Sequence, residues 1–149
     1  MMTLVKQIIL YIIGIGCLYM SFTTRPVAED KLTIFEGIPS NFNEIHSKRY
    51  RTGYFKVGKA EASYKSTEPH YDEIQSIAQG GKPIKVWLNM PYKDSATGQL
   101  YKLNVGDRPV LTYAETLESM KNDNIWTFWM GLLVLALASW RFIFGFFRR

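Results

Sequence analysis

Residues 7–22 read QIILYIIGIGCLYMSF, a run of sixteen positions without a charged side chain. Lys6 precedes the run, and its long aliphatic stem lets the amine reach the headgroup region of a bilayer. At about 1.5 Å per residue, the 19 residues from 4 to 22 span the roughly 30 Å hydrocarbon core. A cleaved signal peptide has the same layout, but the proline within residues 25–28 (RPVA) makes a poor cleavage site. We therefore expect residues 1–22 to form a retained transmembrane helix.

A second apolar run lies near the other end of the chain. Residues 125–140 read IWTFWMGLLVLALASW, again sixteen positions without a charge, and residues 142–147 continue the run beyond one arginine. Tryptophans at both ends of the run are typical of the aromatic belts of membrane helices, and Arg148 and Arg149 favour the cytoplasmic side. We expect residues 125–149 to be a second transmembrane helix with a short basic cytoplasmic end.

The distribution of charge predicts how the chain is oriented. Basic residues at the outer ends of both runs place both termini in the cytoplasm and residues 23–124 across the membrane. The formal net charge of +5 divides accordingly: residues 21–124 hold thirteen acidic and fourteen basic residues, which leaves +1, and the other four basic residues flank them. The single cysteine, Cys17, lies in the first apolar run, so the translocated domain contains no disulfide. Such a domain is typical of the bacterial periplasm, and the bacterial inner membrane is the expected location.

Small residues recur in both apolar runs. Gly131, Ala138 and Gly145 are seven residues apart, so they share one face of a helix, and we expect the first helix to pack against that face. Gly14 and Gly16 would permit the close approach of the first helix. The alternative is that these residues reflect only the tolerance of membrane helices for glycine.

Between the two runs, alternating apolar positions predict β-strands. Glycines within residues 57–59 and 106–107 predict the turns of two hairpins. Trp87, in an apolar strand, is expected to lie in the core. The strands are expected at residues 31–38, 50–57, 60–65, 83–90, 100–104 and 108–112.

Two helices are expected in the same segment. Thr67 caps the first, which has acidic residues in its first turn and ends at the glycines of residues 80–81. Thr112 and Glu115 form a capping box that opens the second. Because neither glycine nor proline follows it, the second helix should continue into the second apolar run, directly or through a kink near residues 122–124. The predicted fold class is α+β: two transmembrane helices flanking a small, mainly antiparallel extracytoplasmic β domain, as a sheet or small barrel, with one or two helices.

Four segments carry a family resemblance: residues 71–74 (YDEI), 81–87 (GKPIKVW), 103–106 (LNVG) and 113–116 (YAET), followed by the final hydrophobic helix. With them the chain resembles small bacterial two-helix membrane proteins that carry one extracytoplasmic β-rich domain of unknown function. The resemblance implies a fold and a location, and it brings no catalytic residues with it.

Two exposed regions are candidates for an interaction surface. A basic cluster lies between the first strands and could contact lipid headgroups, an acidic glycan or a protein partner. A polar loop follows the fourth strand and could also contact a protein partner. The alternative for the basic cluster is a solvated strand end whose alternate residues face inward. The residues of the two regions are His46, Lys48, Arg49 and Arg51, and Tyr92, Lys93 and Asp94.

His70, Asp72 and Glu73 are the one group of residues suited to acid–base chemistry. His70 and Glu73 are three residues apart and can share a helix face, but two such residues do not make a metal site. Neither a phosphate-binding loop nor a catalytic nucleophile has its residues at the required spacing, so no metal and no cofactor is predicted. A nucleic-acid partner is excluded by the expected compartment and by the domain's net charge.

These observations predict a two-pass inner-membrane protein whose extracytoplasmic domain is a non-catalytic protein-interaction module, an accessory or protective factor of the envelope. Its expected partners are the lipid bilayer and another envelope protein. The alternative is a small envelope enzyme or ligand-binding protein that uses a groove near His70, Asp72 and Glu73.

Overall fold

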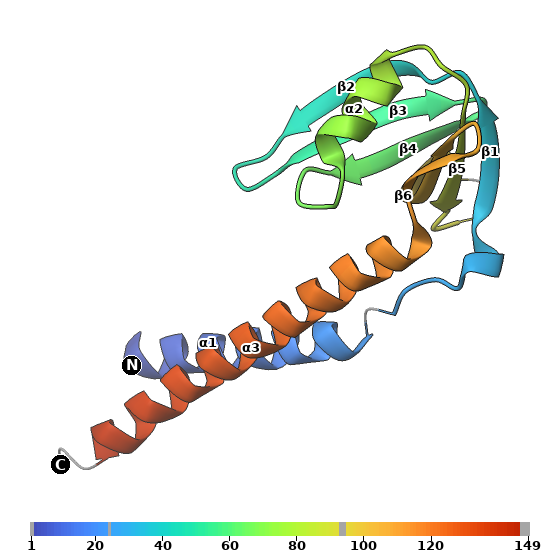
Figure 1. Cartoon of the computed structure of the whole chain (residues 1–149). Coiled ribbons are helices and arrows are strands. Elements are labelled where there is room, and N and C mark those ends of the chain that lie inside the picture. The colour runs from blue at the N-terminus through green and yellow to red at the C-terminus, as the bar shows by residue number, and fades with distance from the viewer. Residues whose placement is uncertain (1, 24, 93–94, 147–149) are drawn as a thin grey trace. The chain divides into compact units, whose positions relative to one another are not determined.

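The computed structural model describes residues 2–23, 25–92 and 95–146 (Figure 1). The chain divides into two compact units. The helical unit comprises Met1–Pro26 and Met120–Arg149, and the sheet unit comprises Val27–Ser119. In chain order the elements are α1 (Met2–Thr23), η1 (Glu29–Lys31), β1 (Thr33–Gly37), β2 (Ser40–His46), β3 (Arg51–Val57), β4 (Ala60–Lys65), α2 (Tyr71–Gln79), β5 (Ile84–Asn89), β6 (Thr97–Val105), β7 (Arg108–Leu111) and α3 (Tyr113–Phe146).

The sheet unit has an α+β fold, as predicted. Its strands follow the order β1-β5-β6-β4-β3-β2, and β7 pairs with the second half of β6. The sheet is mixed rather than antiparallel throughout, because β4 and β6 run parallel and place Ser63 beside Gln99. It curls about one face, and within the described residues no ladder joins the edge strands β1 and β2, so the sheet is an open half-barrel (Figure 1).

Local sequence signals account for both hairpins. Gly58 has φ +61° in the turn between β3 and β4, and Gly106 has φ +58° between β6 and β7, a conformation that glycine adopts without strain. The expected strands are confirmed, and β6 begins earlier than expected, at Thr97. One strand was not predicted: β2 pairs with β3 through a register shift between Ser40 and Asn43.

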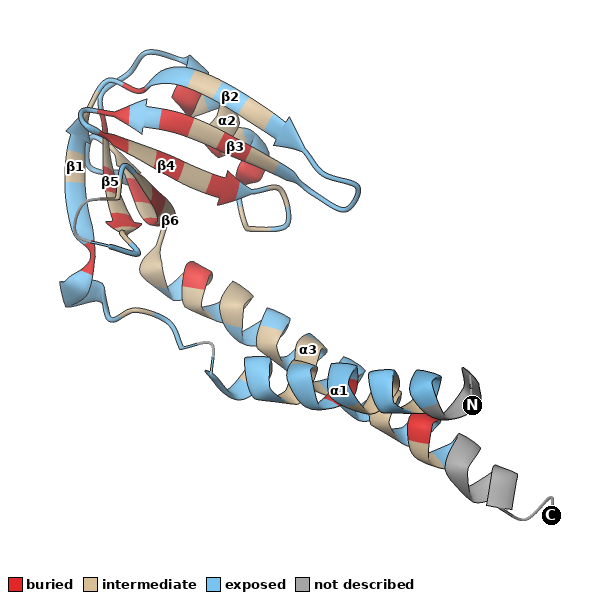
Figure 2. Cartoon of the chain, turned by 180° about the vertical axis from the view of Figure 1, so that it is seen from behind, coloured by how far each residue is buried: buried red, intermediate tan, exposed pale blue. Residues whose placement is uncertain are grey.

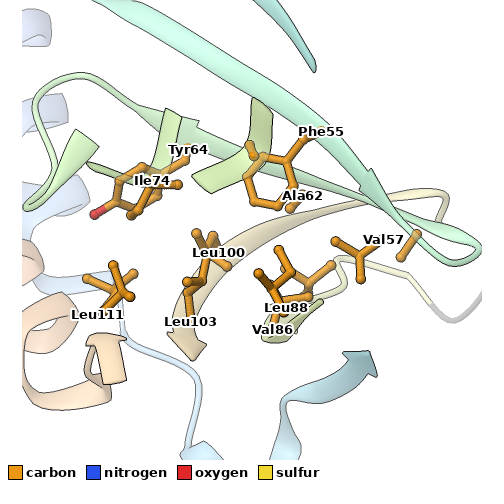
Figure 3. Close-up of a cluster of buried hydrophobic side chains, with 14 of the residues drawn as sticks. Phe55, Val57, Ala62, Tyr64, Ile74, Val86, Leu88, Leu100, Leu103 and Leu111 are labelled. Atoms are coloured by element: carbon orange, nitrogen blue, oxygen red, sulfur yellow. The ribbon is translucent and has the colours of Figure 1, made fainter. Parts of the chain in front are cut away.

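Helix α2 lies across the concave face of the sheet and fills it (Figures 1 and 3). The cluster that it completes draws side chains from β3 to β7, and ten of its residues, Phe55 and Leu103 among them, are labelled in Figure 3. The expected glycine terminus of α2 is confirmed, with Gly81 at φ +67°, and Tyr71, Ile74 and Ala78 are its buried residues. The expected start was wrong: Thr67 does not cap the helix, which begins at Tyr71 after His70 in a left-handed conformation, φ 60°.

Trp87 does not belong to the core. Val86 and Leu88 on either side of it are fully buried, so the alternation of β5 directs Trp87 to the outer face. Two lysines cover its ring there, with the Lys102 amine 4.5 Å and the Lys85 amine 5.8 Å from the ring centroid. Trp87 is therefore held by cation–π contacts on the surface of the sheet.

Helix α3 begins in the sheet unit with the predicted capping box. The backbone N–H of Thr112 donates to Glu115 Oε2 at 2.8 Å, and that of Glu115 donates to Thr112 Oγ1 at 3.3 Å. One turn into the helix, Thr116 donates its hydroxyl to the main-chain oxygen of Tyr101 at 2.7 Å. The expected direct continuation is confirmed, since α3 is a single helix to Phe146.

Tyr113 joins the two points at which the chain enters and leaves the sheet unit. Its hydroxyl donates to the main-chain oxygen of Val27 at 2.8 Å, and its ring stacks on Tyr101, with 6.2 Å between centroids. The first and last segments of the sheet unit are therefore fixed side by side.

In the helical unit, α1 and α3 run antiparallel against each other. Tyr11 Oη and Ser139 Oγ lie 3.1 Å apart, and the rings of Phe22 and Phe128 meet edge to face at 5.9 Å. A Cβ atom added to Gly14 would lie 2.7 Å from Leu135, so only glycine permits this approach.

Within the described residues, one helix is long and apolar enough to cross a bilayer, the segment Val5–Thr23 of α1. A segment of this kind near the N-terminus is either a membrane span or a signal sequence. The expected second span is not found among the described residues. The uncharged stretch of α3 that they include is the sixteen residues 125–140, which falls short of the roughly 20 that a span requires.

Candidate functional site

The predicted basic cluster surrounds the turn between β2 and β3, and the structure divides it into two parts. His46 and Arg51 are paired across the β2–β3 ladder, and both face Glu44. Lys48 and Arg49 occupy the turn itself, where both are exposed and where the described residues offer them no ion pair. The turn, together with the exposed side chains of Ile45 and Tyr50, is called the basic tip below; its residues are Ile45, Lys48, Arg49 and Tyr50.

Glu44 is the centre of a polar joint between β2, β3 and α2. Its carboxylate accepts a hydrogen bond from the Tyr71 hydroxyl at 2.7 Å and lies 2.6 Å from His46 Nε2. The Arg51 guanidinium adds an ion pair at 3.8 Å and lies over the Tyr71 ring, 5.2 Å from its centroid. A Cβ at Gly53 would lie 3.2 Å from the Phe42 ring, tighter than an ordinary contact, and 3.4 Å from the Tyr71 hydroxyl.

The ionisation of this joint follows from its contacts. The hydrogen bond from Tyr71 lowers the pKa of Glu44, with the nearby charges of Arg51 and His46 acting in the same direction. Burial, with the Glu44 carboxylate adjacent, raises the pKa of Tyr71 to about 12. At neutral pH the pair is therefore a carboxylate bound by a neutral phenol, which suits it to holding α2 on the sheet.

Of the three acid–base candidates, His70 and Glu73 lie together and Asp72 does not. His70 Nδ1 is 3.9 Å from Glu73 Oε2, on the shared face that their spacing predicted, and His70 Nε2 is 3.2 Å from Glu115 Oε1. Glu73 also accepts a hydrogen bond from Arg108 at 2.8 Å. Asp72 points elsewhere, with its side chain 90% exposed and 3.7 Å from Arg51. Within the described ranges, no group of three or more histidine, cysteine, aspartate and glutamate side chains is arranged to hold a metal ion.

The structure instead shows a groove on the outer face of the sheet that sequence analysis did not identify. Its volume is about 250 Å³, and it lies over β3, β4 and the start of β6, with the loop between β4 and α2 forming one wall. The residues that line this outer groove are Tyr50, Thr52, Tyr54, Ser63, Tyr64, Lys65, Glu68 and Gln99.

Hydrogen bonds hold the wall of the outer groove in place. Glu68 accepts the backbone N–H of Lys65 at 2.8 Å through one oxygen and the side-chain amide of Gln99 at 3.3 Å through the other. The Tyr64 hydroxyl donates to the main-chain oxygen of Pro69, and burial raises the pKa of Tyr64, so it stays a neutral donor. The Lys65 amine lies 5.4 Å from the centroid of the Tyr50 ring.

The remaining predicted positions are distributed as follows. Tyr92 is 79% exposed and does not line the outer groove. Gly14, Gly131 and Ala138 are buried at the contact of α1 and α3, whereas Gly16 is exposed, with nothing within 4 Å of an added Cβ. Lys93, Asp94 and the surroundings of Gly145 lie outside the described residues.

Comparison of the chain with protein-family models, with curated proteins and with solved structures finds no match. The resemblance to two-helix bacterial membrane proteins therefore stays a prediction.

Proposed function

We propose that the chain is a membrane-anchored, non-catalytic binding module of the bacterial envelope. In this proposal α1 and α3 both cross the inner membrane, both termini are cytoplasmic, and the sheet unit is extracytoplasmic, where its basic tip contacts another envelope protein. The observation that carries the proposal is the character of the helical unit, whose polar and small residues are turned inward and whose large apolar residues are turned outward.

The exposed surface of the helical unit matches lipid rather than water. Ile12, Phe22, Trp126 and Leu137 are each more than half exposed, and many other large apolar side chains of α1 and α3 share this exposure (Figure 2). An exposed apolar surface of this extent marks a membrane or protein contact. The close contact between the helices favours retention of α1, since a cleaved signal sequence would leave this face of α3 uncovered.

Support for a second span comes from both sequence and structure. Beyond Arg141, the apolar residues 142–147 continue the apolar run of α3 past the described side chains. The hydrogen bond between Tyr113 and Val27 brings together the two segments that leave the sheet unit, as two neighbouring membrane helices require.

Cysteine labelling tests the topology. In a Cys17→Ser background, Lys59→Cys in the β3–β4 turn should react with a membrane-impermeant maleimide in intact cells. Arg149→Cys should react only after the cells are permeabilised. Labelling of Arg149→Cys in intact cells, or loss of residues 1–22 from the mature protein by mass, would overturn the two-span arrangement.

Photocrosslinking tests the protein partner. The two cations of the basic tip favour an acidic surface on that partner, and neither is neutralised by a described neighbour. A photoreactive residue at Arg49 should give a discrete adduct in cells, and Lys48→Glu should abolish that adduct. A photoreactive residue at Lys82, an exposed cation in the turn after α2, is the matched control. Absence of an adduct from the photoreactive residue at Arg49, or formation of the same adducts from Lys82, would contradict the proposal.

A further inference from the structure

The outer groove has a composition that selects one class of ligand. Each of its eight lining side chains has a hydrogen-bonding group, three of the eight are tyrosines, and none is aliphatic. Pockets for drug-sized ligands measure roughly 300–1,000 Å³ and are lined mainly by apolar side chains. A groove of about 250 Å³ lined in this way suits a smaller and more polar ligand.

Other ligand classes fit the outer groove poorly. A lipid tail needs an aliphatic lining, which is missing. An anion or a cation needs a surplus of one charge, but the lining has one cation and one anion, Lys65 and Glu68. An extended peptide that binds by strand addition needs a free sheet edge, whereas β3, β4 and β6 are interior strands of the sheet.

We propose that the outer groove binds a carbohydrate, as one or two sugar rings of a glycan. Aromatic rings cover the apolar C–H face of a sugar, and amide, carboxylate and hydroxyl groups bond its hydroxyls, so the observed mixture of groups matches both surfaces of such a ligand. Tyr50 and Tyr54 supply the rings, while Gln99 and Glu68 supply a planar pair of polar groups.

The polar groups of the outer groove are fixed before any ligand binds. The bond between Gln99 and Glu68 orients both side chains, and Ser63 donates its hydroxyl to the main-chain oxygen of Gly98 at 3.2 Å. This Ser63 bond uses the hydroxyl hydrogen and leaves the oxygen able to accept one from a ligand. Preorganised groups of this kind reduce the ordering cost of binding. The outer groove and the basic tip share Tyr50, but their tests use other residues, Tyr54 and Gln99 here and Lys48 and Arg49 there, so the two proposals can fail separately.

The test is saturation-transfer NMR on the full chain in lipid nanodiscs, which avoids detergents with sugar headgroups. The probes are N,N′-diacetylchitobiose, cellobiose and maltose. At least one should receive saturation, and Tyr54→Ala and Gln99→Leu should each weaken its binding by about fivefold or more, as expected for loss of a ring contact or a hydrogen bond.

Two lysine substitutions in neighbouring strands form a matched pair, one inside the outer groove and one outside it as the control. Lys65→Ala should weaken binding, and Lys56→Ala, an exposed position outside the outer groove, should not. Circular dichroism of each variant establishes that it is folded, and Lys65→Ala, an exposed substitution, keeps the test valid if Tyr54→Ala fails to fold. Absence of saturation for all three saccharides, or binding that survives in every folded groove variant, would overturn the proposal.

Discussion

Replacing Thr116 by valine should loosen the attachment of α3 to the sheet. Thr116 is 5% exposed, and its hydroxyl bonds the main-chain oxygen of Tyr101. The ladder of β5 and β6 pairs Leu88 with Leu100 and Trp87 with Lys102, so Tyr101 is the extra residue of a β-bulge. Because a bulge leaves its extra residue out of the ladder, the threonine supplies a partner that the sheet does not.

The size of the effect follows from burial. Valine has nearly the shape of threonine, so the substitution removes the hydrogen bond without opening a cavity. A buried carbonyl left without a partner costs about 1–3 kcal/mol. Since 1.4 kcal/mol corresponds to about a factor of ten, protection against hydrogen exchange in β6 and in the first turns of α3 should fall roughly five- to a hundredfold.

Hydrogen exchange followed by mass spectrometry, on the full chain in nanodiscs, measures this change. Thr116→Ser is the matched control, because it keeps the hydroxyl and loses only one methyl group. The free energy of opening obtained from its protection should stay within about 1 kcal/mol of that of the original chain. Equal protection in the valine variant and the original chain would refute the reasoning, as would an equal loss in the serine and valine variants.

Two further predictions concern the polar joint and the helical unit. Because the folded state lowers the pKa of Glu44 below its usual value of 4.5, the carboxylate stabilises the fold above that pH and loses this contribution as the pH falls through the folded pKa. The Tm should therefore decline between about pH 6 and about pH 3, and Glu44→Gln should make this decline smaller. Parallel curves of Tm against pH for the original chain and the variant would contradict the prediction. Gly14→Ala should weaken pairing of α1 with α3 by about 1–3 kcal/mol, because its Cβ would meet Leu135, whereas Gly16→Ala should have no effect. The yield of a crosslink formed by a short bis-maleimide between Tyr11→Cys and Ser139→Cys, in a Cys17→Ser background, measures this pairing, and equal yields in the two alanine variants would contradict it.

The parts of the fold that sequence analysis predicted are those set by neighbouring residues. The turn at Gly58 depends on a left-handed glycine, and the capping box of Thr112 and Glu115 depends on a spacing of three residues. Both signals act within a few residues, so they can be recognised without knowing the rest of the fold.

Strand β2 was missed because its pattern contradicts the usual alternation. Asn41 has a left-handed φ of 53°, and the ladder shifts register beside it. Beyond the shift, the polar Glu44 faces inward to Tyr71 and the apolar Ile45 faces outward, 54% exposed. Hydrophobic periodicity assigns these two residues to the wrong sides, and only the contact with α2 explains the reversal.

The outer groove could not be predicted because its parts are distant in sequence. Tyr54 and Ser63 belong to one hairpin, but Gln99 reaches them only through the parallel pairing of β4 with β6. The bulge at Tyr101 did leave a signal, since Leu100 and Leu103 are three residues apart and cannot share one face of a regular strand.

Three carboxylates of the sheet unit, one of them an acid–base candidate, join its elements. Glu115 caps α3, Glu73 pairs with Arg108, and Glu44 binds Tyr71, so each carboxylate connects a helix to the sheet or completes a helix end. A group that is held in this way is costly to use for proton transfer, because a change in its ionisation weakens the fold. Among the described ion pairs, none involves Lys48 or Arg49 of the basic tip, so these cations take no part in the joints.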